Sequence, residues 1–261
     1  MARLLPDTGS ELLWTYDTAT NLWRRFSFTD QIATEACWGP DGREIVYLSH
    51  RNNEFGLYKM AADGTGQEET LLTTPFWRAP RSLSRDRRHL LFENYEAGTG
   101  FDLWLLTLGG GAAPAPLVKT PFSEGNGVFS PDGAWVAYMS NKSGRFEVYV
   151  QAFPPNGQEW KVSAGVAGFV GGTSRRGILW RADGKELYYT ADDWQEMAVP
   201  ISTAHALQAG VPVPLFRVPP DSQVDATADG QQFLVNAPVE SAVSGLPLSV
   251  VLHWTAEHSA D

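Results

Sequence analysis

Short apolar segments separated by polar turns run through the chain, and the clearest example lies between Gly127 and Val150. An apolar segment ends at Phe129 and is followed by Ser-Pro-Asp-Gly, a second apolar segment, a polar loop and a third segment, 146–150, with alternating residue character. Such alternation is typical of a β-strand with one buried face. Proline sets the backbone angle φ that a turn needs, aspartate accepts hydrogen bonds from nearby backbone N–H groups, and glycine tolerates positive φ. The pattern therefore predicts a β-hairpin followed by a third strand.

The same pattern recurs at a regular period. Successive turn aspartates are 45, 46, 51 and 46 positions apart. An apolar strand follows each turn, an aromatic residue stands 17 or 18 positions past the first three aspartates, and a weaker fourth strand follows in most repeats. The aspartates that anchor the five repeats are Asp41, Asp86, Asp132, Asp183 and Asp229.

Four short antiparallel strands per period of about 45 residues are typical of a β-propeller blade. A lone four-stranded sheet cannot bury both faces, so blades stack on their neighbours. We therefore expect an all-β fold, a single-domain β-propeller over residues 1–261 with four-stranded antiparallel blades, five full repeats and a partial one. An all-β sandwich with accidental repetition is the alternative. Only residues 201–209 show some helical character.

The two ends of the chain look like parts of blades. Residues 12–17 and 23–27 have the pattern of third and fourth strands, whereas residues 226–236 and 248–254 supply first, second and third strands but no fourth. Propellers commonly complete one blade with strands from both termini, which removes exposed strand edges. The segment 12–27 is therefore expected to close the ring, which gives five or six blades and a monomer.

The composition narrows the possible partners. With 20 Lys and Arg against 30 Asp and Glu, the net charge is −10, which disfavours nucleic-acid binding because phosphate contacts need a basic surface. No apolar run approaches the roughly 18 residues of a membrane-spanning helix, so no direct membrane insertion is expected. The first residues lack the apolar core of a signal peptide. The sequence alone does not decide the cellular compartment of the protein. The single cysteine, Cys37, is expected to be a buried structural thiol.

No catalytic or metal-binding constellation emerges from the motifs. The glycine-rich loop, catalytic-loop aspartate and Asp-Phe-Gly site of a protein kinase are missing, as is the Gly-x-Ser-x-Gly of serine hydrolases. The five histidines lack metal-ligand spacing. The repeated aspartates belong to separate turns, whereas calcium needs six to eight oxygens around one point. We expect no enzyme activity, no metal and no cofactor.

Five arginines crowd the stretch from Arg78 to Arg88. The repeat register puts Arg78 before a blade's first strand and Arg85 to Arg88 in the turn after it. Since a strand advances about 3.3 Å per residue, the two groups should stand at opposite ends of that strand. A shared anion site is therefore not expected.

What remains is a surface formed by the loops that enter each first strand and those that join second to third strands. Exposed aromatic residues mixed with arginine are typical of binding hot spots. The alternative is that these aromatic residues only cover the ends of the blades. The residues expected to bind a ligand are Phe76, Trp77, Arg78, Tyr95, Phe122, Glu124, Asn126 and Trp194.

The Ser-Pro-Asp-Gly repeats with their apolar second strands resemble TolB-like, WD-repeat-like β-propellers. The order of Phe129-Ser-Pro-Asp-Gly, Trp180-Arg-Ala-Asp-Gly and the closing Val250-Val-Leu-His-Trp resembles the C-terminal propeller of bacterial membrane-anchored serine/threonine kinases. The resemblance departs at Arg85-Asp86-Arg87, where proline and glycine are replaced, and at the start, where half a blade is missing.

The resemblance implies a non-catalytic binding or sensing module, the extracytoplasmic tail of a receptor-like kinase. Its ligand would be a protein, a peptide or a glycan. The alternative is a propeller enzyme, a hydrolase or lyase with its site in the axial funnel, because fold alone does not decide function.

Overall fold

A computed structural model describes residues 13–17, 20, 22–26, 32–166, 177–203, 206–220, 222–236 and 250–251. In these ranges the chain forms strands β1 to β22 and no helix. It divides into two compact units, Met1–Pro121 and Phe122–Asp261. Each unit is an array of antiparallel sheets.

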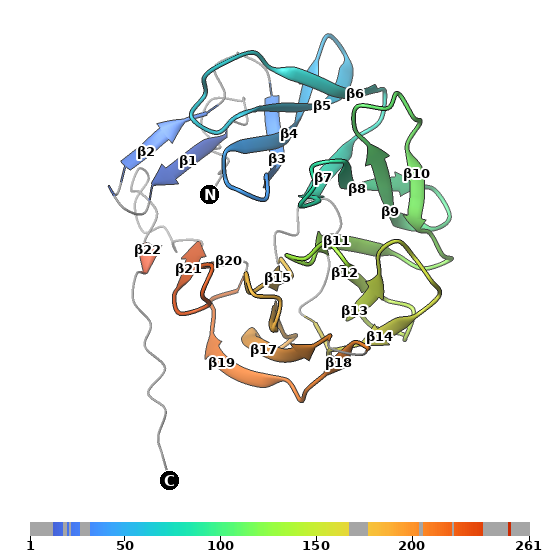
Figure 1. Cartoon of the computed structure of the whole chain (residues 1–261), viewed down its shortest axis with the longest axis vertical. Coiled ribbons are helices and arrows are strands. Elements are labelled where there is room, and N and C mark those ends of the chain that lie inside the picture. Colours follow the sequence, from blue (N-terminus) through green and yellow to red (C-terminus); the bar gives the residue numbers. More distant parts are fainter. Residues whose placement is uncertain are drawn as a thin grey trace. The chain divides into compact units, whose positions relative to one another are not determined.

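The first unit contains two four-stranded sheets with their strands in chain order (Figure 1). A two-stranded sheet, β1 (Trp14–Asp17) and β2 (Leu22–Arg25), precedes them, as the sequence predicts for this region. Sheet I consists of β3 (Ile32–Trp38), β4 (Glu44–Arg51), β5 (Glu54–Ala61) and β6 (Glu69–Thr74). Sheet II consists of β7 (Arg78–Leu83), β8 (His89–Glu96), β9 (Gly100–Thr107) and β10 (Ala115–Val118).

The second unit repeats this arrangement. Sheet III consists of β11 (Glu124–Phe129), β12 (Trp135–Ser140), β13 (Glu147–Ala152) and β14 (Glu159–Lys161). Sheet IV consists of β15 (Leu179–Trp180), β16 (Glu186–Thr190), β17 (Gln195–Ser202), β18 (Gln208–Ala209) and β19 (Val213–Arg217), the last two both pairing with β17. Sheet V consists of β20 (Gln223–Ala226), β21 (Phe233–Asn236) and β22 (Val250–Val251).

Near the C-terminal end, the described strands differ in extent from the expected elements. The helical character expected over 201–209 is wrong where the chain is described, because β17 continues to Ser202 and β18 follows at Gln208–Ala209. The third strand predicted over 248–254 is described only at Val250 and Val251. Closure of a single ring by residues 12–27, with the monomer that it implies, stays a prediction.

The repeated turns have the predicted chemistry. Gly133 adopts a φ of 75°, and Asp132 accepts hydrogen bonds from the Ser130 hydroxyl at 2.5 Å and from the Ala134 N–H at 3.0 Å. In the divergent turn, Arg87 takes the glycine position with a φ of 59°, and its guanidinium forms ion pairs with Asp41 and Glu44 of sheet I. The turn geometry is therefore kept where its glycine is lost.

Apolar side chains of sheets I and II form one core, as expected for stacked blades. The ends of β1 and β2 contribute Leu13 and Phe26 to a second cluster against sheet I. Cys37 packs, partly buried, against the shared core, and burial raises the pKa of its thiol to about 12, which agrees with a structural thiol. The buried members of the shared core are Val46, Leu48, Leu57, Leu83, Leu90, Phe92 and Leu106.

A buried ion-pair triad also joins sheets I and II. Arg81 of β7 donates to Glu35 of β3 at 2.8 Å and to Glu93 of β8 at 2.7 Å, and all three side chains are nearly inaccessible to solvent. The sequence grouped Arg81 with four neighbouring arginines, but its role is internal. A buried charge removed from its partners costs several kcal/mol, so this triad binds the two sheets into one unit.

Candidate functional site

Four of the predicted binding residues belong to the first unit and meet at one end of sheet II. Arg78 is the first residue of β7 and pairs with Asn94, near the end of β8. Tyr95 pairs in turn with Phe101, at the start of β9. Because these strands are antiparallel, the start of β7, the end of β8 and the start of β9 share one edge of the sheet. Phe76, Trp77, Arg78 and Tyr95 therefore gather there, as predicted.

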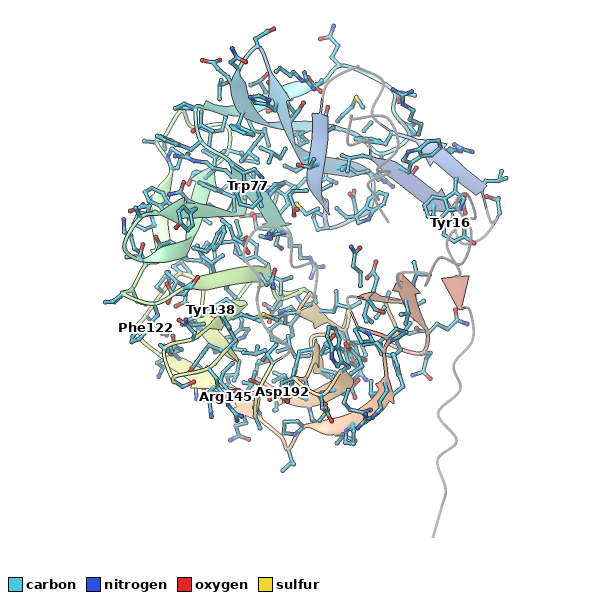
Figure 2. All side chains as sticks on the ribbon, turned by 180° about the vertical axis from the view of Figure 1, so that it is seen from behind. Tyr16, Trp77, Phe122, Tyr138, Arg145 and Asp192 are labelled. Atoms are coloured by element: carbon cyan, nitrogen blue, oxygen red, sulfur yellow. The ribbon has the colours of Figure 1, made fainter. Side chains whose placement is uncertain are left out.

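The side chains at this end form what we call the aromatic surface, which consists of Phe76, Trp77, Tyr95 and Phe101. Phe76 and Tyr95 are 64% and 60% exposed. Phe101, half-buried, is packed edge-on by Trp77 at 6.1 Å and by Tyr95 at 5.2 Å between ring centroids. Trp77 also packs against the core of the unit, so it does cover the end of the sheet, whereas Phe76 and Tyr95 face solvent. Trp77 is labelled in Figure 2.

Phe101 is a residue that sequence reasoning missed. Its signal is its position directly after Gly100, opposite Tyr95 in the hairpin that joins β8 and β9. Aromatic residues that face each other across antiparallel strands stabilise the pair. A search for cross-strand aromatic pairs in each repeat would have found it.

Arg78 lies beside this surface, half-buried at the sheet end. Its guanidinium carbon is 5.4 Å from the centroid of the Phe92 ring, and its Nε is buried without a hydrogen-bond partner. Burial lowers the pKa of Arg78, while the charge of Glu96 opposes that shift. Even a lowered arginine pKa leaves the group charged at neutral pH. Arg78 is thus a fixed positive charge at the edge of the aromatic surface.

Two acidic residues on the same face, Glu96 and Asp102, accept hydrogen bonds from neighbouring side chains. Glu96 accepts hydrogen bonds from Asn94 at 3.2 Å and from Lys119 at 2.5 Å. Asp102 is fully buried, accepts a hydrogen bond from Thr99 at 2.8 Å, and keeps its Oδ1 without a partner. Burial raises the pKa of Asp102 above its ordinary value.

The other four predicted binding residues belong to the second unit. Phe122 is 43% exposed, and Trp194, half-buried, lies between β16 and β17 with a φ of 65°. The prediction that Glu124 and Asn126 lie in a loop is wrong. Both belong to β11 and are buried, since the strand begins earlier than the apolar pattern indicates. A role of these residues in binding stays a prediction.

Glu124 illustrates why a polar residue can stand inside this fold. Its carboxylate accepts a hydrogen bond from Ser140 at 3.0 Å, and Ser140 pairs in the sheet with Glu147. A polar row thus crosses sheet III near the end where β11 begins. Buried polar groups are stable only when they are hydrogen-bonded, and the row supplies these bonds internally.

Two buried carboxylates near the starts of third strands were also missed. Glu147 of β13 accepts hydrogen bonds from the Ser163 hydroxyl at 2.6 Å, the Gly165 N–H at 2.5 Å and Arg145 Nε at 3.1 Å. Burial raises its pKa, but these hydrogen bonds outweigh that effect and hold the pKa of Glu147 below its ordinary value. In the alternating sequence pattern, Glu147 and Glu196 both occupy positions that would face solvent. The pattern therefore does not indicate that they are buried.

Glu196 of β17 has only one donor, Thr190 Oγ1 at 2.8 Å, and its Oε1 has no partner. Burial raises the pKa of Glu196 to about 7. The carboxyl is therefore partly protonated at neutral pH. Glu196 is fully buried and Glu147 is 1% exposed, so neither is open to a substrate in this conformation.

The loop after Ser163 sits tightly between its neighbours. A Cβ on Gly165, whose φ is 105°, would lie 3.1 Å from Asp192 Oδ2 and 3.3 Å from Arg145 Nη1. Figure 2 shows Arg145 and Asp192 close together. The positive φ favours glycine, and a Cβ here would also require the side chains of Asp192 and Arg145 to shift slightly.

Within the described ranges, no group of three or more histidine, cysteine, aspartate or glutamate residues could hold a metal ion. No helix of these ranges is long and apolar enough to cross a membrane.

Solved structures of other proteins have folds similar to that of this chain. No protein-family model matches the chain. TolB from Acinetobacter baumannii is similar with a TM-score of 0.67 and 18% identity, over 92% of this chain and 57% of the TolB chain. This chain thus spans little more than half the length of that TolB.

Two further structures show the range of proteins with this fold. A chain of a nidogen/laminin complex matches with a TM-score of 0.63 and 11% identity, over 90% of this chain and 84% of that one. An oligogalacturonate lyase in complex with manganese matches with a TM-score of 0.61 and 15% identity, over 94% of this chain and 72% of the lyase. At sequence identities this low, the similarity establishes a common fold but not a common function. The protein has a TolB-like β-propeller fold with several four-stranded antiparallel sheets.

Proposed function

We propose that the chain is a non-catalytic binding module that engages a protein or peptide through the aromatic surface of sheet II. The observation that carries this proposal is the exposure of Phe76 and Tyr95, 64% and 60%, at the end of a well-packed sheet. Leaving large apolar side chains in water forgoes about 1.5–3 kcal/mol of burial for each. Aromatic residues and arginine at such a place are typical of the hot spots of protein interfaces.

The comparisons support a binding role at the level of fold. One similar chain is part of a nidogen/laminin complex, which is an assembly between proteins. The resemblance of the repeats to the C-terminal propeller of bacterial receptor-like kinases supports a finer proposal, that the chain is the extracytoplasmic sensor or interaction tail of such a kinase. Both supports are analogies, because one fold hosts many functions.

An enzyme is the second candidate, because one similar structure is an oligogalacturonate lyase. Glu147 and Glu196 have pKa values pushed in opposite directions, which is a property of acid–base pairs. Both side chains are however inaccessible to solvent. A catalytic acid must come within hydrogen-bond reach of its substrate, so burial favours the binding module.

The test is a selection of random peptides on the full chain, with an oligosaccharide array in parallel. We expect peptides that bind saturably, with affinity at least tenfold weaker for the double variant F76S/Y95S. The matched control is V211S/V213S, which changes two exposed apolar residues of the second unit, 82% and 50% exposed. Equal loss of affinity in both variants, or binding of oligosaccharides alone, would contradict the proposal.

A further inference from the structure

Arg78 differs from every other half-buried arginine of the described chain. Arg51 pairs with Glu68, and Arg81 pairs with Glu35 and Glu93. Arg181 likewise pairs with two carboxylates, those of Asp183 and Glu186. Arg78 has no ion pair within the described residues, and its Nε lacks a hydrogen-bond partner. The Nε of Arg81 also lacks a partner, but the other two nitrogens of that guanidinium pair with carboxylates.

The acidic groups nearest to Arg78 do not supply the missing acceptor. Glu96 accepts hydrogen bonds from Asn94 and Lys119, and its charge acts on Arg78 without forming an ion pair with it. Asp102 lies two strands away, beyond Asn94 in the same row across the sheet. Adjacent strands are about 4.8 Å apart, which places the two backbones about 10 Å from each other.

This arrangement is unfavourable in the free protein. A buried N–H donor without an acceptor costs about 1–3 kcal/mol. The chain carries 30 acidic residues against 20 basic ones, so acidic partners are plentiful. A guanidinium with an unsatisfied buried donor beside exposed aromatic rings is a local departure of the kind that functional sites show.

We propose that Arg78 binds a carboxylate of an acidic peptide segment of the partner, while an apolar side chain of that segment packs on Phe76 or Tyr95. The planar guanidinium offers paired N–H donors that match a carboxylate. This inference rests on the proposed function, since it specifies the ligand of the same surface.

The fold also sets the spacing that such a peptide needs. Successive residues of a strand point to opposite faces, so Arg78 and Tyr95 flank the two faces of the sheet end. A peptide that contacts both must cross this end in an extended form. With about 3.3 Å per residue and about 10 Å between stacked sheets, the acidic and apolar residues should stand two or three positions apart.

A peptide fits this site better than an acidic sugar. A sugar ring stacks on the flat face of an aromatic ring, but Trp77 and Tyr95 stand at 80° and 63° to Phe101. Because the rings are turned in different directions, they form no continuous flat surface on which a sugar could stack. They leave gaps between them that a side chain can enter. The flexible side chains of a peptide can enter such gaps.

The test compares three full-length proteins against random twelve-residue peptides displayed on phage and against a purified oligogalacturonide, which carries carboxylates on a sugar. The proteins are the wild type, R78Q and R88Q. Arg88 is an exposed arginine in the turn before β8, at the opposite end of the sheet, and is the matched control.

We expect selected peptides to share an aspartate or glutamate two or three positions from an apolar residue. Their affinity should fall at least tenfold in R78Q and less than twofold in R88Q. A further variant, R78M, should unfold at a temperature equal to or above that of the wild type, because it removes an unsatisfied buried donor. A loss of binding caused by misfolding would instead lower that temperature.

The other outcomes overturn the inference in separate ways. Selected peptides without a shared acidic residue, or unchanged by R78Q, would contradict the role of Arg78 while the proposed function stands. Oligogalacturonide binding that R78Q abolishes, with no peptide selected, would contradict the peptide as the source of the carboxylate. No binding of either probe to the wild type would contradict the proposed function itself.

Discussion

Glu147 and Glu196 stand near the start of the third strand of successive sheets, and their surroundings shift the two pKa values in opposite directions. Each pairs across the sheet with a hydroxyl residue, Ser140 or Thr190. Glu147 receives several further donors that stabilise its charge, whereas Glu196 receives only the Thr190 hydroxyl. One repeat position thus carries a carboxylate in sheet III and a partly protonated carboxyl in sheet IV.

The variant E196Q should remove a pH dependence of stability. The folded pKa of Glu196, about 7, lies above its ordinary value of 4.5. Its contribution is therefore fully present below pH 4.5 and is lost as the pH rises through 7. Relative to the wild type, E196Q should gain about 2–4 kcal/mol between pH 4.5 and pH 8. Urea unfolding across this range measures the difference.

The control is E147Q, for which the sign is reversed. The folded pKa of Glu147 is lowered, so its stabilising contribution is present above the ordinary value and is lost as the pH falls. E147Q should be less stable than the wild type at pH 7, and the gap should narrow below pH 4.5. Parallel pH profiles for the two variants would contradict the assignment of their environments.

The buried triad should dominate the stability of the first unit. R81M leaves Glu35 and Glu93 without their shared cation, and breaking a buried ion pair costs about 3–5 kcal/mol. The triple variant E35Q/R81M/E93Q removes all three charges and should recover part of this loss. Chemical unfolding measures both, and an unchanged midpoint for R81M would show that the triad is not buried.

The turns should respond unequally to substitution. Gly133→Val forces a β-branched residue into a φ of 75°, which should cost about 1–3 kcal/mol. Arg87→Gly relieves a φ of 59° but removes the ion pairs to Asp41 and Glu44, so its effects oppose each other. Urea midpoints should fall clearly for the first variant and change little for the second. Equal midpoints would count against the repeat register.

The sequence predicted the repeats well because their turns rest on local chemistry. Proline, aspartate and glycine act within a few residues, and so the strand pairs around Asp132 follow from the pattern alone. Phe76 and Tyr95 were found for the same reason, since the register places them at strand ends. Glu124 was assigned to a loop and Glu196 was missed, because the burial of each depends on side chains that other strands supply. The ion pairs of Arg81 were not predicted, since its partner Glu35 is 46 positions away.

Absence of catalysis is a separate expectation of the binding module. The purified chain should turn over no peptide, ester, lactone, glycoside or oligogalacturonate substrate, with or without added manganese. Activity assays over this panel are the measurement. Turnover that survives repurification and is abolished by E196Q would contradict the proposal and favour the enzyme.

The most direct test of the binding module is amide hydrogen exchange of the full chain with and without a selected peptide. A ligand at the aromatic surface should slow exchange in residues 76–78 and 94–101, which hold the exposed rings and Arg78, and should leave the turn at 85–88 unchanged. Protection confined to the second unit, or none at saturating peptide, would contradict the assignment of the binding site to sheet II.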